Sequence, residues 1–158
     1  MSEYAELQVS SNFSFLRSAS HPRELMAAAA LSGLKAIALT DRNTLSGIVL
    51  AHSFLKQNPT SGTRFIVGCR LDLANGAGLL CYPTDRAAYG RLTRLLTLGR
   101  RRAAKGMCDL SLADVAGHSE GQRFIVPFPH ALNEAAAGHI RTCATMFPGR
   151  VHLALTHS

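Results

Sequence analysis

Residues 35–47, KAIALTDRNTLSG, constrain the fold of this chain more than any other stretch. Residues 36–39 form an apolar run that suits a buried strand and is too short for a helix. Thr40 and Asp41 are polar, and Asn43 or Thr44 can cap a helix that we expect from about 44 to 56. A strand that leads through polar residues into a helix is typical of α/β folds, which usually place their chemistry at this end of the strands.

The other patterns predict strands and helices that alternate along a single domain, residues 1–158. We expect further strands at 4–10, 64–73, 77–82, 123–126 and 151–156, and further helices at 22–31, 84–98, 110–116 and 133–146. Asn75 and Gly76 predict a hairpin between two of the strands. The element order is therefore β-α-β-α-β-β-α-α-β-α-β. This order implies an α/β fold, either a sheet or a barrel, with mostly parallel strands and one inserted hairpin.

Three local features carry more specific expectations. The first strand alternates, which predicts one face with Ala5, Leu7 and Val9 and a second, polar face. In the loop at 11–20, we expect the apolar side chains to pack down as a hydrophobic lid, formed by Phe13, Phe15 and Leu16. In the helix that begins near Thr84, we expect a buried stripe of leucines and an end at Gly99; the stripe is Leu92, Leu95 and Leu96.

The composition indicates a globular domain with a basic surface. Hydrophobic residues make up 47% of the chain and charged residues 17%, and the net charge is +7. No apolar run is long enough for a transmembrane helix, and the N-terminus does not look like a signal peptide, so we expect a cytoplasmic protein without membrane contact. The positive charge permits attraction to nucleic acid but does not establish it. The densest basic run either contacts DNA or another domain or is a solvated loop; it comprises Arg100, Arg101, Arg102 and Lys105.

The cysteines and histidines show none of the spacings of a metal site. The cysteines form no CxxC pair, so we expect buried free thiols rather than zinc ligands at Cys69, Cys81, Cys108 and Cys143. The histidines lie at 21, 52, 118, 130, 139, 152 and 157. Of these, His118 and His130 flank a predicted strand and could approach the polar ends of the strands. Most are expected to be ordinary surface or core histidines.

The ends of the first three predicted strands hold too few ligands for a metal centre. A metallohydrolase needs His, Asp or Glu at several strand ends. The residues found there are Gln8 and Ser10, Asp41 and Arg42, and Cys69 and Arg70. Only Asp41 is a plausible ligand, so we expect no metal and no cofactor. Instead, Asp41 is expected to accept backbone hydrogen bonds that order the following turn.

The arginines near these strand ends allow two interpretations. Arg17, Arg42 and Arg70 could form a small anion pocket, paired with Asp41 or with a phosphate. Alternatively, they fill the space through salt bridges. The sequence leaves both open.

The chain resembles the PHP (polymerase and histidinol phosphatase) domain family in three ordered motifs. These are LQVSSNFSFL at 7–16, AIALTDRNTLSG at 36–47 and IVGCRLDL at 66–73. The similarity is closer to the N-terminal PHP domain of bacterial C-family DNA polymerases, the replicase alpha-subunit family, and to their error-prone, damage-induced branch. That similarity extends to CYPTDRAAYGRLTRLLTLGRRRAAKG and so covers almost the whole chain. It implies a distorted β/α barrel, of which this chain would supply a truncated first part.

At most of the family's metal-ligand positions this chain carries another residue type. The two histidines of the first motif fall on Gln8 and Ser10, and its aspartate falls on Arg17. The second-motif histidine falls on Arg42 and the third-motif glutamate on Arg70. Only Asp41 matches its counterpart. The resemblance therefore implies a degenerate PHP domain without metal-dependent activity.

Three functions follow from the sequence as hypotheses. The leading one is a non-catalytic, scaffolding PHP segment of an error-prone DNA polymerase that acts in translesion synthesis and DNA repair. Its partners would be the remainder of the polymerase chain and, through the full-length protein, DNA; alone it would be inactive. The alternatives are a metal-dependent PHP phosphoesterase and a stand-alone basic nucleic-acid-binding module. An incomplete barrel would also expose an edge strand and apolar surface, which predicts marginal stability or self-association.

Overall fold

The computed structural model describes residues 4–129 and 131–155, and the chain forms two compact units, Met1–Cys69 and Arg70–Ser158. Both units combine helices with a sheet, and each contains parallel strands. The mixed α/β class expected from the sequence is therefore confirmed. Among the described residues, no helix combines the length and the apolar content that crossing a membrane requires.

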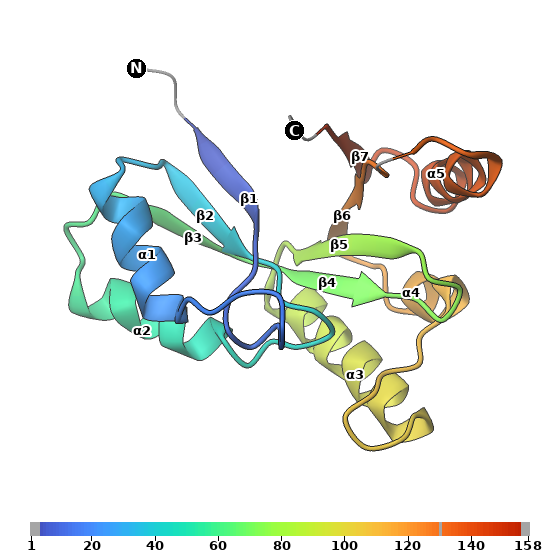
Figure 1. The fold of residues 1–158 in the computed structure, drawn as a ribbon, viewed down its shortest axis with the longest axis horizontal. Coiled ribbons are helices and arrows are strands. Elements are labelled where there is room, and N and C mark those ends of the chain that lie inside the picture. Colours follow the sequence, from blue (N-terminus) through green and yellow to red (C-terminus); the bar gives the residue numbers. More distant parts are fainter. Residues whose placement is uncertain (1–3, 130, 156–158) are drawn as a thin grey trace. The chain divides into compact units, whose positions relative to one another are not determined.

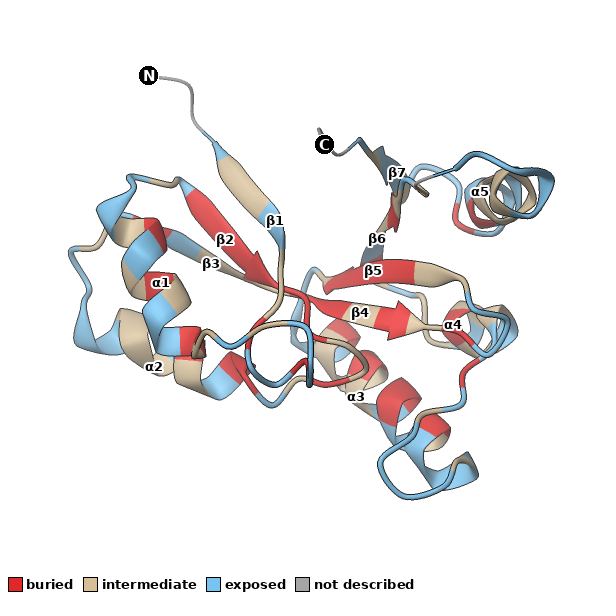
Figure 2. Ribbon diagram, viewed as in Figure 1, coloured by how far each residue is buried: buried red, intermediate tan, exposed pale blue. Residues whose placement is uncertain are grey.

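The first unit is a parallel three-stranded sheet with two helices packed against it. Its elements are β1 (Ala5–Val9), α1 (Pro22–Leu31), β2 (Ala36–Leu39), α2 (Ile48–Gln57) and β3 (Arg64–Val67), and the strand order is β1-β2-β3. The central strand, β2, has the predicted bounds and is buried along its whole length (Figure 2). Helices α1 and α2 lie side by side (Figure 1) and share a core with β2, made of Met26, Ala29, Ile37, Leu39, Ile48 and Ala51.

The two helices of this unit differ in how well the sequence predicted their ends. Helix α1 begins at Pro22 and is followed by Gly33 at φ +67°, as expected. Its N-cap is His21, which no pattern had indicated. Helix α2 begins at Ile48 rather than near residue 44: Asn43 has a left-handed φ of +49°, and a turn closed by the hydrogen bond from the backbone N–H of Ile48 to the oxygen of Leu45 precedes the helix.

The second unit is built on a four-stranded sheet. Its elements are β4 (Cys69–Asp72), β5 (Gly78–Pro83), α3 (Arg86–Arg102), α4 (Leu112–Gly117), β6 (Gln122–Pro127), α5 (Glu134–Met146) and β7 (Val151–Ala154). The strand order is β4-β5-β6-β7, with β5 and β6 antiparallel and β6 and β7 parallel. The predicted hairpin joins β4 to β5. The predicted leucine stripe of α3 is buried, and so are Cys69, Cys81 and Cys143, whereas Cys108 is half-buried.

The prediction of one continuous strand over 64–73 was wrong. The chain leaves the first sheet after Val67 and enters the second at Cys69, so the segment is divided at Gly68. Glycine weakens strands because it has no side chain to pack and allows many backbone angles. A single glycine within this segment thus marks the boundary between the two sheets.

The expected faces of β1 and of the loop that follows it were also wrong. Leu7 is exposed and Glu6 half-buried, because the β1–β2 register shifts between Glu6 and Val9 and interrupts the alternation. In the loop, Phe15 is 84% and Leu16 87% exposed, so these residues form no lid over the unit. The loop is closed instead by hydrogen bonds from its backbone, such as that from Asn12 to Ser20.

Gly99 lies inside α3 and does not end it. A Cβ atom at this position would lie only 2.7 Å from Cys108 Sγ and from Leu110 Cδ2, so the helix needs a glycine to approach the following segment. The expectation that Gly99 terminates the helix was wrong because close packing, not the helix end, requires the glycine.

We predict opposite effects for alanine at the two glycines of α3. Gly99→Ala should destabilise the protein by about 1–3 kcal/mol, because the added methyl group overlaps buried neighbours. Gly90→Ala is the matched control; nothing lies within 4 Å of its added Cβ, and it should stabilise by up to about 1 kcal/mol through helix propensity. Urea unfolding of both variants measures the difference. Equal effects would show that the close approach at Gly99 is not structurally important.

Candidate functional site

Asp41 lies at the end of β2 with only 2% of its surface exposed, and its carboxylate accepts three hydrogen bonds. The backbone N–H of Ser11 donates to Oδ1 at 2.7 Å, and the Ser11 hydroxyl donates to Oδ2 at 2.7 Å. The Ser14 hydroxyl donates to Oδ1 at 2.6 Å. Ser11 and Ser14 are themselves fully buried or nearly so. We call Asp41, Ser11 and Ser14 the Asp41 cluster; it joins the loop after β1 to the end of β2.

Further contacts tie this cluster to the surrounding backbone. Ser14 Oγ accepts a hydrogen bond from the backbone N–H of Arg42 at 3.1 Å, and Cys69 Sγ donates to the backbone oxygen of Asp41 at 3.5 Å. A Cβ at Gly47, the N-cap of α2, would lie 3.2 Å from Asp41 Oδ2. The carboxylate therefore lies beside the N-terminus of a helix, where the helix dipole favours a negative charge.

The residues around Asp41 do not fit a divalent metal. Both of its carboxylate oxygens already accept hydrogen bonds from protein donors. Of the neighbouring positions on the first strand and loop, Gln8 and Arg17 are exposed and Ser10 is half-buried. Within residues 4–129 and 131–155, no three His, Cys, Asp or Glu side chains gather as ligands would. The Asp41 carboxylate therefore accepts hydrogen bonds from hydroxyl and amide groups, and the side chains around it do not supply the ligands that a divalent cation needs.

The structure places the three arginines of the predicted anion pocket in different settings. Arg42 is half-buried, and its backbone joins the Asp41 cluster. Arg17 is exposed in the loop after β1. Arg70 belongs to the second unit, where its Nε donates to Asp72 Oδ1 at 2.9 Å. The anion pocket therefore stays a prediction, whereas the salt-bridge alternative describes Arg70 directly.

The sequence had indicated that His118 and His130 could approach the polar ends of the strands. His118 follows α4, and its Nδ1 lies 2.8 Å from the backbone oxygen of Asp114, a local contact at the helix end. His130 lies outside the described residues.

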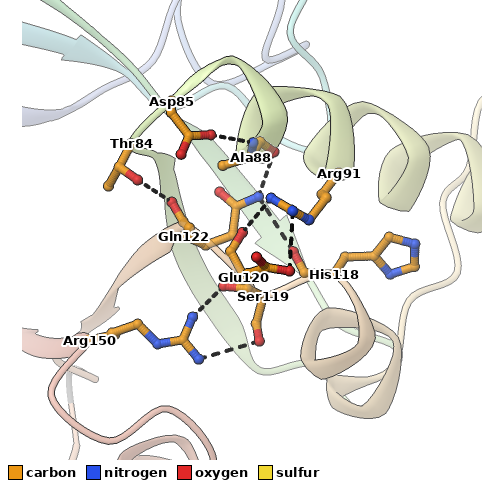
Figure 3. A network of polar contacts seen from close by, with 10 residues as sticks. Thr84, Asp85, Ala88, Arg91, His118, Ser119, Glu120, Gln122 and Arg150 are labelled. Carbon is orange, nitrogen blue, oxygen red and sulfur yellow. Dashed lines mark hydrogen bonds and ion pairs between the residues drawn. The ribbon is translucent and has the colours of Figure 1, made fainter.

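A second buried polar group, Gln122, was missed by the sequence reasoning (Figure 3). Gln122 on β6 is 2% exposed; its Nε2 donates to the backbone oxygen of Ala88 at 2.7 Å, and its Oε1 accepts from Cys81 Sγ at 3.4 Å. It therefore links the first turn of α3 to β5 and β6. Only its position in a strand with alternating burial could have indicated that this polar side chain points inward.

The loop between α4 and β6 extends these contacts around Gln122. Arg91 forms an ion pair with Glu120 at 3.1 Å, and Thr84 Oγ1 donates to the backbone oxygen of Gly121 at 2.7 Å. Arg150 donates to the backbone oxygen and the hydroxyl of Ser119 (Figure 3). These contacts, together with those of Gln122, form what we call the Gln122 network. It fixes the N-terminal part of α3 to the sheet.

The basic run predicted from the sequence lies at the end of α3. Arg100, Arg101 and Arg102 form its last turn, Lys105 lies in the loop that follows, and all are exposed. Arg102 Nη1 forms an ion pair with Asp114 Oδ2 at 2.7 Å. This contact and the hydrogen bonds from Ser111 lower the pKa of Asp114 to about 2, and the same ion pair raises the pKa of Arg102. The charge of Arg102 is thus balanced within the protein.

Comparison with known proteins gives consistent family matches. The family model of the PHP domain matches residues 6–156. An error-prone DNA polymerase from Caulobacter vibrioides is 48% identical over 156 residues, which cover 98% of this chain. Error-prone DNA polymerase 2 from Rhizobium meliloti is 49% identical over 152 residues, which cover 96% of this chain. The match spans 14% of the length of each of these relatives.

Solved structures with little sequence similarity share the fold. An amidohydrolase from Chromobacterium violaceum has a TM-score of 0.64 at 15% identity, over 94% of this chain and 75% of its own. A putative metal-dependent phosphoesterase from Bifidobacterium adolescentis has a TM-score of 0.63 at 11% identity, over 90% of this chain and 75% of its own. These similarities confirm the expected fold, and the family model covers nearly every residue. This chain therefore belongs to the PHP domain family.

Proposed function

We propose that this chain is the N-terminal PHP segment of an error-prone DNA polymerase and that it stabilises the polymerase rather than catalysing a reaction. The identity of 48% and 49% to two error-prone polymerases supports this role. Because the match spans 14% of their length, the polymerase activity would belong to the remainder of such a chain. The biological setting would be translesion synthesis and DNA repair in the cytoplasm.

The Asp41 cluster is the observation that carries the non-catalytic part of this proposal. Asp41 is the one residue that matches the ligands expected of the family, yet its two oxygens are occupied by three protein donors. A carboxylate used in this way holds the loop after β1 against β2. In this chain the Asp41 carboxylate would thus stabilise the fold through hydrogen bonds instead of binding a metal.

A metal-dependent phosphoesterase is the second candidate. The Bifidobacterium adolescentis protein is a putative metal-dependent phosphoesterase, and its fold is similar to this one. At 11% identity, that similarity supports the fold alone. The ligand positions occupied by Gln8, Ser10 and Arg42 favour the scaffolding role instead.

A scaffolding role requires a surface that contacts the remainder of the polymerase chain, and the outer edge of β7 is suited to this contact. Within the described residues, β7 pairs only with β6, so its outer edge offers free backbone groups. Leu153 is 43% and Leu155 79% exposed beside this edge. We assign this edge to the remainder of the polymerase, with self-association of the chain as the outcome when that partner is absent.

We predict that Asp41 is needed for stability whether or not metal is present. Asp41→Ala should cost roughly 3 kcal/mol or more, because it leaves three buried donors without an acceptor. Asp41→Asn should cost about 1–2 kcal/mol, since one amide oxygen can still accept from Ser11 and Ser14. Asp109→Ala, which removes an exposed carboxylate, is the control and should stay within about 0.5 kcal/mol of wild type.

Urea unfolding with a chelator and with added Zn²⁺ or Mn²⁺ measures these effects. The losses should be equal in both conditions. A loss seen only with metal would assign Asp41 to a metal site and contradict the structural role.

A chimera tests the scaffolding role itself. We would replace the matched segment of the Caulobacter polymerase with this chain and compare it with a polymerase that lacks the segment. The chimera should be soluble and extend a primer, and the deletion should lose solubility or melt at a lower temperature. The proposal fails if the deletion is as stable and active as the chimera, or if the purified chain hydrolyses a phosphate ester when Mn²⁺ is added.

A further inference from the structure

Helix α3 is strongly basic along its whole length. Its 17 residues include six arginines and no acidic residue. The basic run recognised in the sequence covers only its last turn, so the positive charge extends further than that run. The six arginines differ in whether the protein balances their charge.

Three of the six have partners within the protein. Arg91 pairs with Glu120, and Arg102 pairs with Asp114. Arg100 also has an interaction within the protein. Among the described residues, no hydrogen bond or ion pair is found for the side chains of the remaining arginines, which are all exposed: Arg86, Arg94 and Arg101.

These three arginines lie on one face of the helix. They are separated by eight and then seven residues, which at about 100° per residue places them within roughly 80° of one another around the axis. The buried residues of α3 occupy the opposite side; they are Ala88, Leu92, Leu95, Leu96 and Gly99. We call Arg86, Arg94 and Arg101 the α3 stripe. At about 1.5 Å per residue it spans roughly 22 Å.

The stripe is held by a rigid support. Asp85 caps the first turn by accepting from the backbone N–H of Ala88 at 2.7 Å, and Gln122 bonds the backbone oxygen of Ala88 (Figure 3). At the other end, Gly99 packs closely against Leu110. Both ends of the helix are therefore fixed within the second unit, so the spacing of the three arginine Cα atoms is set before any ligand binds.

We propose that the α3 stripe binds the phosphate backbone of nucleic acid without reading its sequence. Arginine forms bidentate hydrogen bonds to phosphate oxygens. Because these three arginines form no ion pair within the described residues, binding a phosphate breaks none. A span of about 22 Å matches six or seven nucleotides of one strand of a duplex. The net charge of +7 would draw the nucleic acid toward this surface.

The residues between the arginines favour nucleic acid over an acidic protein. Protein interfaces generally have apolar or aromatic anchors at their centre. The exposed positions on this face, Ala87 and Thr97, are small and offer no such anchor. The proposal concerns the second unit alone and does not depend on the Asp41 cluster or on a polymerase partner.

The test measures binding of the full chain to a fluorescently labelled oligonucleotide of about 20 nucleotides, single-stranded or duplex, between about 50 and 200 mM salt. The stripe variant is Arg86→Gln, Arg94→Gln and Arg101→Gln. The control removes the same charge from exposed positions of the first unit: Arg23→Gln, Lys56→Gln and Arg64→Gln. Circular dichroism melting curves establish that both variants are folded.

Wild type should bind both oligonucleotides, and its affinity should fall with salt. The stripe variant should bind at least about tenfold more weakly at low salt. Its log–log salt slope should be smaller by about two units for the single strand and about three for the duplex, because about three phosphate contacts are lost. The control should change the slope by much less. Equal effects of the two variants, or no binding by wild type, would overturn the proposal. Stronger binding to a polyglutamate peptide than to DNA would assign the stripe to an acidic protein instead.

Discussion

The buried carboxylate of Asp41 is the interaction on which the first unit depends. A carboxylate removed from water is costly unless donors replace its hydration, and here three donors from Ser11 and Ser14 do so. The N-terminus of α2 adds a favourable electrostatic contribution at Gly47. One side chain thereby holds the loop after β1, the end of β2 and the start of α2 in register. Both oxygens of Asp41 are therefore engaged by donors of the protein itself.

In the second unit, the strongly basic helix α3 has to be held against a sheet. Leucines and Gly99 on one side of α3 pack into the core, and Gln122 bonds its first turn. The arginines consequently lie on the other side. Where acidic residues are near, as at Asp114 and Glu120, the charge is balanced within the protein. Where they are not, it faces solvent and is available to an anion.

The sequence predicted those features that depend on local patterns. The bounds of the buried strand β2 and the Pro22 start of α1 follow from neighbouring residues, and the structure confirms them. Features that depend on distant residues were missed. The partners of Asp41 lie 27 and 30 residues away, and no local pattern connects them. Gly68 was placed inside a predicted strand, but the two sheets divide there, and Gly99 was expected to end a helix, but close packing against Cys108 and Leu110 requires it.

Together these observations describe a member of the PHP domain family in which a buried carboxylate, Asp41, is held by three protein hydrogen-bond donors. The most direct test is the metal content of the purified chain after incubation with Zn²⁺ and Mn²⁺ and removal of unbound ions, measured by plasma mass spectrometry. Our account predicts that metal is retained well below one ion per chain, and that Asp41→Asn retains the same trace amount. Stoichiometric metal in wild type that is lost in Asp41→Asn would contradict it.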